Sequence, residues 1–196
     1  MKGNFLLCLL TTALLVFLLG FSKYDPNCGR YKDEYYNLTD DSKSKINFKG
    51  FDTLVFISNV GDTATLFGHG KTQTNVAFPQ QTTNADCPGI TEYYEKIEIG
   101  FFGDSPELHN LNFKYYVKES SAKDYIELRM DNHYFFTKVL SYMNNPTNYL
   151  DTIIYKNNKI YGFNASADDN SSYCLYNLNY GVLRLKINGG KTWILN

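Results

Sequence analysis

The amino-acid sequence predicts an all-β protein, a single-domain antiparallel meander that forms a curved sheet, a sandwich or a half-barrel. Apolar and polar residues alternate with a period of two along much of the chain, as at residues 111–117. This period is typical of strands with one buried and one solvated face. Clusters of turn-forming residues, such as residues 103–106, separate these segments, so neighbouring strands are expected to pair antiparallel.

Composition narrows the class of protein. The chain has 196 residues, with 19 Lys and Arg against 20 Asp and Glu, and it contains 17 Tyr and 14 Phe. The balanced charge excludes a strongly basic nucleic-acid-binding protein, so no nucleic acid is expected among its partners. The aromatic content excludes a disordered chain, because such a sequence can bury enough apolar surface to offset the entropy of folding.

The first 22 residues predict a signal peptide or a membrane anchor. Lys2 precedes an uncharged apolar run over residues 5–21, and a basic start followed by such a run is typical of a secretory signal. Gly20 and Ser22 fit a small-residue cleavage site at its end. The run also reaches the lower length that a helix needs to cross a bilayer. An uncleaved hydrophobic helix that holds the protein at a membrane is therefore the alternative.

Residues 23–47 are predicted to form a tether that contains one short helix. Thr39 is followed by Asp40 and Asp41. Threonine is a favoured N-cap residue, and acidic side chains in the first turn interact favourably with the helix dipole. We therefore expect a helix of one or two turns up to Lys45, ahead of an antiparallel β domain at residues 48–196.

About a dozen short strands are expected in this β domain. They are residues 53–58, 63–67, 74–78, 97–101, 111–117, 126–130, 134–140, 152–156, 160–163, 173–178, 183–187 and 192–195. Gly68-His69-Gly70 is interpreted as a hairpin bend, since isolated glycines in strands usually mark a bulge or a bend. Asn188-Gly189-Gly190 predicts a tight turn that places Trp193 on the buried face of the last hairpin.

Three cysteines, Cys28, Cys87 and Cys174, follow the N-terminal segment. In an oxidising compartment, the simplest arrangement of three cysteines is one disulfide and one spare thiol. We predict the pair Cys87–Cys174 in preference to Cys28–Cys87, because Cys87 and Cys174 both belong to the folded domain.

No residue pattern predicts a catalytic, cofactor or metal site. The three histidines are scattered, no C-x-x-C pair occurs, and G-x-S-x-G and H-E-x-x-H are absent. Asp124 and Glu127 lie three residues apart in an expected strand, so they point to opposite faces and cannot act as a carboxylate pair. We therefore expect no enzymatic activity, no cofactor and no metal, and an envelope hydrolase ranks third among the candidate functions.

Tyrosines on solvated strand faces are the candidate binding residues. Adjacent tyrosines in a strand place one ring on each face of the sheet, so some rings are expected to be partly exposed. The candidates for a surface that binds a glycan, a peptide or a lipid are Tyr93, Tyr94, Tyr116 and Tyr176. Cross-strand stacking of aromatic residues, which are ordinary strand formers, is the structural alternative.

Several segments of the chain are similar to a known group of sequences. They are residues 35–41 (YYNLTDD), 50–56 (GFDTLVF), 61–63 (GDT), 68–70 (GHG), 180–183 (YGVL) and 190–193 (GKTW). These segments resemble uncharacterised exported proteins of Bacteroidetes, many of which look like lipoproteins. The resemblance implies a location in the cell envelope and no particular activity. The chain departs from the lipoprotein pattern, because no cysteine directly follows its apolar run.

These observations predict an exported protein of the periplasm, the outer-membrane surface or the extracellular space. We expect it to act as a non-catalytic binding or structural module, with membrane contact through the N-terminal segment if that segment is uncleaved. The alternative is a half-barrel carrier of lipid or of a small hydrophobic ligand. An apolar cavity inside the sheet would favour the carrier, whereas a filled core would favour binding at the outer surface.

Overall fold

The computed structural model describes residues 33–80, 90–118, 123–143, 145–149, 151–167, 171–188 and 190–196. The strands in these residues are β1 (Glu34–Tyr36), β2 (Thr53–Ser58), β3 (Thr63–Gln80), β4 (Ile90–Ser105), β5 (Leu108–Lys118), β6 (Lys123–Met130), β7 (His133–Val139), β8 (Asp151–Tyr155), β9 (Asn158–Ser166), β10 (Tyr173–Asn177), β11 (Gly181–Lys186) and β12 (Thr192–Leu195). The helices are α2 (Asp40–Ser44), α3 (Leu140–Met143) and the 3-10 helix η1 (Pro146–Asn148).

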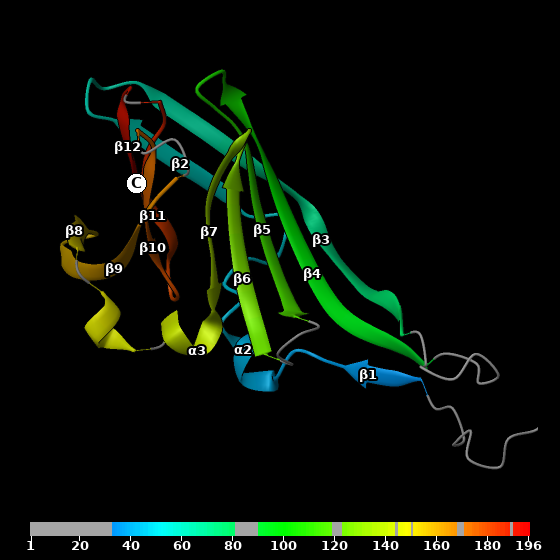
Figure 1. The fold of residues 1–196 in the computed structure, drawn as a ribbon. Coiled ribbons are helices and arrows are strands. Elements are labelled where there is room, and N and C mark those ends of the chain that lie inside the picture. Colours follow the sequence, from blue (N-terminus) through cyan, green and yellow to red (C-terminus); the bar gives the residue numbers. More distant parts are fainter. Residues whose placement is uncertain are drawn as a thin grey trace, which may run out of the picture. The chain divides into compact units, whose positions relative to one another are not determined.

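The predicted all-β antiparallel architecture is confirmed (Figure 1). The strands described here form one twelve-stranded sheet in the order β7-β6-β5-β4-β3-β2-β12-β11-β10-β9-β8, and β1 pairs with β4 beside this path. The predicted N-terminal hydrophobic helix lies outside the described residues. In the part of the chain that the structure describes, no helix combines the length and the apolar character needed to span a membrane.

The predicted bend at Gly68-His69-Gly70 is wrong, because these residues lie inside the single long strand β3. The Gly68 N–H donates to the Asp52 carbonyl at 2.9 Å, and the Gly70 N–H donates to the Gly50 carbonyl at 2.7 Å. The segment before β2 therefore continues the ladder along β3. A Cβ atom on Gly68 would lie 2.4 Å from the Gly50 carbonyl oxygen, so the glycine allows close approach rather than a turn.

The short helix predicted after Thr39 is confirmed as α2. The Thr39 hydroxyl accepts a hydrogen bond from the Ser42 N–H at 3.2 Å, as an N-cap residue does. The Thr39 N–H and hydroxyl both donate to Asp124 Oδ2 in β6, at 3.0 and 2.6 Å. Asp124 therefore fixes the start of the helix against the sheet.

The chain divides into two compact units, residues 1–35 with 77–93 and residues 36–76 with 94–196. The described part of the first unit consists of the ends of β1, β3 and β4, where the Tyr35 and Tyr93 rings stack with centroids 4.7 Å apart. β1 lies within the segment that was predicted to be a tether. The predicted boundaries at residues 22 and 47 stay predictions.

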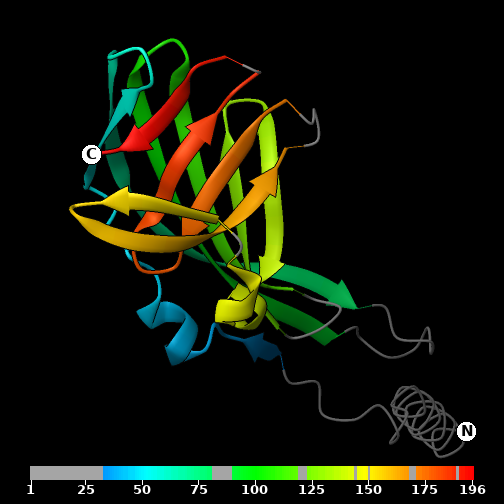
Figure 2. The ribbon, with the colours of Figure 1, turned by 90° about the vertical axis from the view of Figure 1, so that its left-hand side faces the viewer.

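Within the second unit the sheet curls into a half-barrel. Strands β9–β12 face β4–β7 across its interior (Figure 2). The terminal strand β7 approaches β9, where the Phe136 and Phe163 rings meet edge to face with centroids 5.6 Å apart. Side chains rather than backbone hydrogen bonds therefore join the two ends of the curl at this point.

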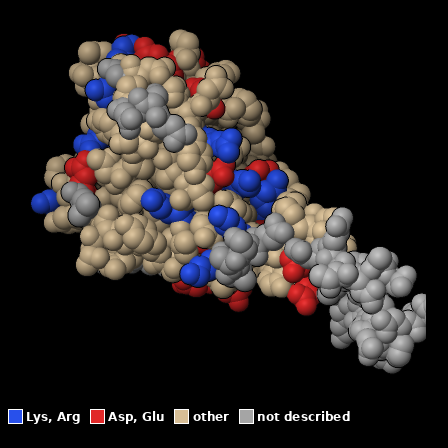
Figure 3. Space-filling model, viewed as in Figure 1, with Lys and Arg blue, Asp and Glu red and all other residues tan. Residues whose placement is uncertain are grey.

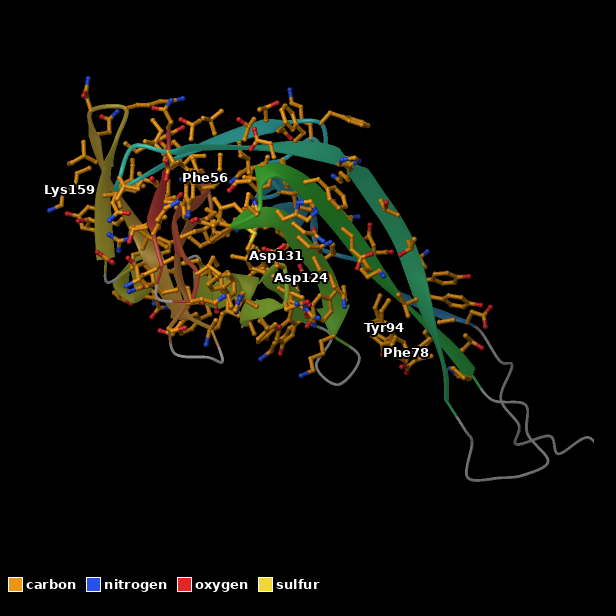
Figure 4. All side chains as sticks on the ribbon, turned by 90° about the horizontal axis from the view of Figure 1, so that it is seen from above. Phe56, Phe78, Tyr94, Asp124, Asp131 and Lys159 are labelled. Atoms are coloured by element: carbon orange, nitrogen blue, oxygen red, sulfur yellow. The ribbon has the colours of Figure 1, made fainter. Side chains whose placement is uncertain are left out.

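Inward-pointing side chains fill the half-barrel. The largest of them are Tyr115, Tyr176, Phe56, Phe101 and Phe113, each less than 2% exposed. Figure 4 shows Phe56 inside the curl, whereas Lys159 on β9 points away from it. Trp193 is 2% exposed, which confirms its predicted place on the buried face of the last hairpin.

Cys174 lies in β10 and is a free thiol that is completely buried. The predicted Cys87–Cys174 disulfide is not found among the described residues, where Cys174 points into the core. Cys28 and Cys87 lie outside the described residues. Burial disfavours the thiolate and raises the pKa of Cys174, so this thiol is chemically protected.

Candidate binding surface on the outer face of the sheet

Two of the four candidate tyrosines are not at the surface. Tyr176 is 0% exposed, and its hydroxyl lies 3.3 Å from the Tyr115 hydroxyl inside the half-barrel. Tyr94 is 4% exposed, because the ring of Tyr36 in β1 stacks on it with centroids 4.8 Å apart. The prediction of an exposed ring is wrong for both residues. Tyr93 stays partly exposed beside Tyr35.

Tyr116 is partly exposed and lies on the outer face of β5. Strand β5 alternates strictly, so that Phe113 and Tyr115 point inward while Lys114 and Tyr116 point outward. The antiparallel register sets Tyr125 of β6 directly opposite Tyr116. The two rings are stacked, with centroids 5.7 Å apart and an interplanar angle of 23°. The outer face thus carries a cross-strand tyrosine pair.

A third tyrosine, Tyr134 of β7, extends this pair. Its hydroxyl donates to Thr137 Oγ1 at 2.5 Å, and Thr137 lies opposite Glu127 on the same face of the sheet. Partial burial is the main cause that raises the pKa of Tyr116, and the nearby Glu127 carboxylate adds to the rise. The Tyr116 hydroxyl therefore stays neutral at physiological pH, and Thr137 holds the Tyr134 ring in place.

Each of these three rings carries one cation over its face. Lys114 Nζ lies 4.8 Å from the Tyr116 centroid, and Lys118 Nζ lies 5.5 Å from that of Tyr125. The Arg129 guanidinium carbon lies 5.6 Å from the Tyr134 centroid. Such contacts contribute about 0.5–1 kcal/mol at exposed sites. The tyrosine–lysine face, as we call this surface, consists of Lys114, Tyr116, Lys118, Lys123, Tyr125, Arg129 and Tyr134.

The outer face is basic where residues 96–102 of β4, 112–118 of β5 and 123–129 of β6 pair, although the whole chain has a formal net charge of −1. The charged side chains of this stretch are the basic Lys96, Lys114, Lys118, Lys123 and Arg129 and the acidic Glu98 and Glu127, which lie opposite Lys114 on its two sides. Figure 3 shows Lys and Arg side chains gathered over these strands.

Ion pairs account for only part of this charge. Lys96 Nζ pairs with Glu98 at 3.2 Å, and Arg129 Nε pairs with Glu127 at 2.6 Å. No carboxylate of the described residues forms an ion pair with the remaining cations of this face, which are Lys114, Lys118 and Lys123. These lysines are therefore available to an anionic ligand.

A second polar feature lies where hairpin ends of the second unit meet. A hollow of about 580 Å³ is lined there by residues that include Glu107, Asp131, His133 and Lys191. Lys191 Nζ lies 2.7 Å from Glu107 Oε1 and 2.8 Å from Asp62 Oδ2. The hydrogen bond with Lys191 is the main cause that lowers the pKa of Asp62. The charges of this hollow thus largely satisfy one another.

Two histidines that the sequence leaves apart are close to one aromatic ring. His69 of β3 and His109 of β5 both contact Phe102 of β4 edge to face, with centroids 4.4 and 6.2 Å away. Phe102 is 42% exposed. No group of three or more His, Cys, Asp or Glu in the described ranges is placed to hold a metal ion.

Tyr125 and Tyr134 are the surface residues that sequence reasoning missed. A hairpin that joins Lys118 to Lys123 through residues 119–122 would have placed Tyr125 opposite Tyr116, since the register follows from the turn length. Tyr134 carries no comparable signal in the sequence, because a register shift between Leu128 and Arg129 changes its pairing.

Comparison with protein-family models, curated proteins and solved structures finds no match for this chain.

Proposed function

We propose that the protein is an exported, non-catalytic module of the cell envelope that binds its partner through the tyrosine–lysine face. The observation that carries this proposal is the contrast between the two faces of β5 and β6. The inner face is filled by buried side chains, while the outer face presents an ordered row of tyrosines and three lysines without carboxylate partners among the described residues.

The filled core favours surface binding over the carrier alternative. A carrier encloses its ligand in an apolar cavity of roughly 300–1,000 Å³. Inside this half-barrel the opposite walls meet where the Tyr115 and Tyr176 hydroxyls are in contact. A hollow of about 380 Å³ lies instead at the seam between β7 and β9, where polar residues such as Thr137 and Asn164 line it beside Phe136. The hollow at the hairpin ends is lined by Pro106, Ile187 and Trp193 together with charged and amide side chains, and these polar groups suit a lipid tail poorly.

Export rests on the N-terminal segment and on the resemblance to exported proteins of Bacteroidetes. Lys2 and the apolar run at residues 5–21 have the organisation of a secretory signal. Mass spectrometry of the N-terminus of native material tests this part of the proposal. A mature chain that begins near Lys23 supports a cleaved signal, and an intact N-terminus in the membrane fraction supports an anchor. An intact chain in the cytosol would contradict export.

Binding is tested by affinity electrophoresis of the purified protein in gels that contain dextran, polygalacturonate or dextran sulfate. The double variant Tyr116→Ser/Tyr125→Ser removes the stacked pair and releases both lysines from their rings. The matched control is Tyr161→Ser, because Lys159 Nζ lies 5.2 Å from the exposed Tyr161 ring on β9. We expect the double variant to lose retardation by at least one polymer, while the control keeps it.

Two outcomes would overturn the binding site. The first is the absence of retardation by every polymer, and the second is equal retardation of the wild type and the double variant. Thermal unfolding of each variant accompanies the gels, so that a loss of folded protein is distinguished from a loss of binding. A surface change of this kind is expected to alter the unfolding free energy by about 1–2 kcal/mol at most.

A further inference from the structure

We propose that the ligand of the tyrosine–lysine face is an anionic polysaccharide, whose carboxylate or sulfate groups pair with Lys114, Lys118 and Lys123. This inference rests on the proposed function and names the chemistry of its ligand. It follows from three features of the face, namely its unpaired cations, their restricted positions and their spacing along the sheet.

The cations are available and two of them are held in place. Tyr116 lies beneath the ammonium group of Lys114 and Tyr125 beneath that of Lys118, at 4.8 and 5.5 Å from the ring centroids. A lysine that is already restricted loses less side-chain entropy when it binds a ligand. The rings therefore act mainly as supports for cations, and this role explains why Lys114, Tyr116 and Lys118 alternate on the outer face of β5.

The spacing of the cations favours a polymer over a single small anion. Lys114 and Lys118 lie four residues apart on β5, which corresponds to about 13 Å along an antiparallel strand. Lys123 lies opposite Lys118 on the neighbouring strand. One carboxylate or sulfate cannot reach both ends of this row, whereas a chain with repeated anionic groups can contact all three lysines at once.

Polar groups beside the row of lysines suit the hydroxyl groups of a sugar chain. Asn112 precedes Lys114 on the outer face of β5, and Thr137 lies on the same face in β7, as the register with Arg129 and Glu127 shows. Their amide and hydroxyl groups can donate and accept hydrogen bonds with neutral hydroxyls. A polysaccharide is thus matched in both its anionic and its neutral groups.

Other polyanions fit this surface less well. Single-stranded nucleic acids gain much of their affinity from bases that stack on aromatic rings, but here lysine and arginine side chains already lie over the ring faces. A membrane surface would be bound more tightly by a basic face that also carries apolar side chains able to insert. The residues beside the lysines of this face are the tyrosines Tyr116 and Tyr125, rather than aliphatic residues.

The test compares the affinities of full-length protein for polygalacturonate, dextran sulfate and neutral dextran in a microplate binding assay. The triple variant Lys114→Gln/Lys118→Gln/Lys123→Gln removes the charges, and the triple Lys→Arg variant at the same positions keeps them. Exposed ion pairs are worth about 0.2–1 kcal/mol each. We therefore expect the Gln variant to bind polyanions on the order of tenfold more weakly, and the Arg variant to bind like the wild type.

Salt and a charge control sharpen the test. Screening shortens the range of charge interactions to about 3 Å at 1 M salt, so binding to the polyanions should be lost in high salt. Lys159→Gln removes a lysine that lies over a tyrosine on β9, and it should leave the affinity unchanged. An equal loss in this control would indicate dependence on net charge alone and would overturn the inference.

The outcomes separate this inference from the proposed function. Salt-resistant binding to neutral dextran that needs Tyr116 and Tyr125 but not the lysines would overturn the anionic ligand and keep the binding site. Binding to single-stranded DNA or to anionic phospholipid vesicles, without binding to the polysaccharides, would overturn the ligand class. No binding to any polymer would overturn both.

Discussion

Tyr115 and Tyr116 are identical neighbours on β5 with opposite environments. Tyr115 is 0% exposed and shares a hydroxyl contact with Tyr176 across the core. Tyr116 is partly exposed, stacks on Tyr125 and lies beneath Lys114. Burial raises the pKa of Tyr115 to about 12. Because side chains alternate between the two faces of a strand, Tyr115 lies in the core and contributes to stability, whereas Tyr116 lies on the candidate binding surface.

The contrast extends along both strands and gives the two faces separate roles. Inward residues such as Phe113 and Ile126 are 0% exposed and hold the half-barrel together. Outward residues such as Lys114 and Arg129 contact rings and solvent. Substitutions on one face should therefore change the free energy of unfolding, while those on the other should change ligand affinity.

The largest expected effect comes from Phe113→Ala. The Phe113 ring packs against Phe48 and Phe101 with centroids 4.7 and 6.0 Å away, and truncation of such a buried ring costs about 3–5 kcal/mol of unfolding free energy. Urea unfolding measures this loss, with Phe113→Leu as a milder variant if the Phe113→Ala protein does not fold.

The surface control is Lys114→Gln, one residue away, which should change the unfolding free energy by about 0.5 kcal/mol or less and weaken polyanion binding. Equal stability losses would contradict the two-face assignment.

A smaller loss is expected at Glu95, the one buried acid that faces α2. Glu95 is 2% exposed, and its carboxylate accepts hydrogen bonds from the Leu38 N–H at 2.8 Å, from Lys43 Nζ at 2.9 Å and from Gln73 Nε2 at 2.6 Å. Glu95→Ala leaves these donors unpaired and should cost about 2–4 kcal/mol.

The outer-face counterpart of Glu95 is Glu98, which pairs with Lys96 in partial contact with solvent. Glu98→Ala should cost about 1 kcal/mol or less. The two variants are compared by urea unfolding at neutral pH. If Glu98→Ala proved as damaging as Glu95→Ala, the distinction between the buried and the solvated carboxylate would be wrong.

A third effect separates the hydroxyl groups of the two neighbouring tyrosines. Tyr115→Phe leaves the buried Tyr176 hydroxyl without its partner, which should cost about 1–3 kcal/mol. The double variant Tyr115→Phe/Tyr176→Phe should recover much of this loss, because no hydroxyl is then left unpaired in the core. Tyr116→Phe, which removes a hydroxyl from a partly exposed ring, should cost less than about 1 kcal/mol. If the double variant had a lower unfolding free energy than both single variants, the contact between the Tyr115 and Tyr176 hydroxyls would not be the source of the loss.

The sequence predicted the fold well wherever a strand has one solvated face. Strands β2 and β12 begin and end at the predicted residues, and Thr39 caps α2 as expected. Alternation failed at Gly68, because pairing with Gly50 and Asp52 is a long-range feature that no local pattern encodes. Helix α3 was missed because it follows β7 directly, so that its first residue, Leu140, was included in the predicted strand at residues 134–140.

The candidate surface was only partly predictable. Tyr116 was placed correctly because its strand alternates without interruption. Tyr94 was misplaced because β1, which covers it with Tyr36, lay in a segment expected to be a tether. Tyr176 was misplaced because β10 is buried along most of its length, so its sequence does not alternate between polar and apolar residues. Cross-strand partners such as Tyr125 require the register, which sequence alone leaves open.

The smallest expected effect is a difference in alkaline stability. Below pH 10 the inner tyrosines are neutral in both folded and unfolded chains, so their contribution to stability is complete. Between pH 10 and about 12 an unfolded chain ionises Tyr115 while the folded protein keeps it protonated, since burial raises its pKa to about 12. The unfolded state then binds fewer protons, and the unfolding free energy falls as pH rises.

Tyr115→Phe removes one such group, so the unfolding free energy of this variant should decline less steeply over this range than that of the wild type. Tyr116→Phe should change the slope less, because the pKa of Tyr116 is raised by partial burial only. Urea unfolding at a series of pH values measures all three slopes, and a steeper change for Tyr116→Phe than for Tyr115→Phe would reverse the assignment of the inner and outer rings.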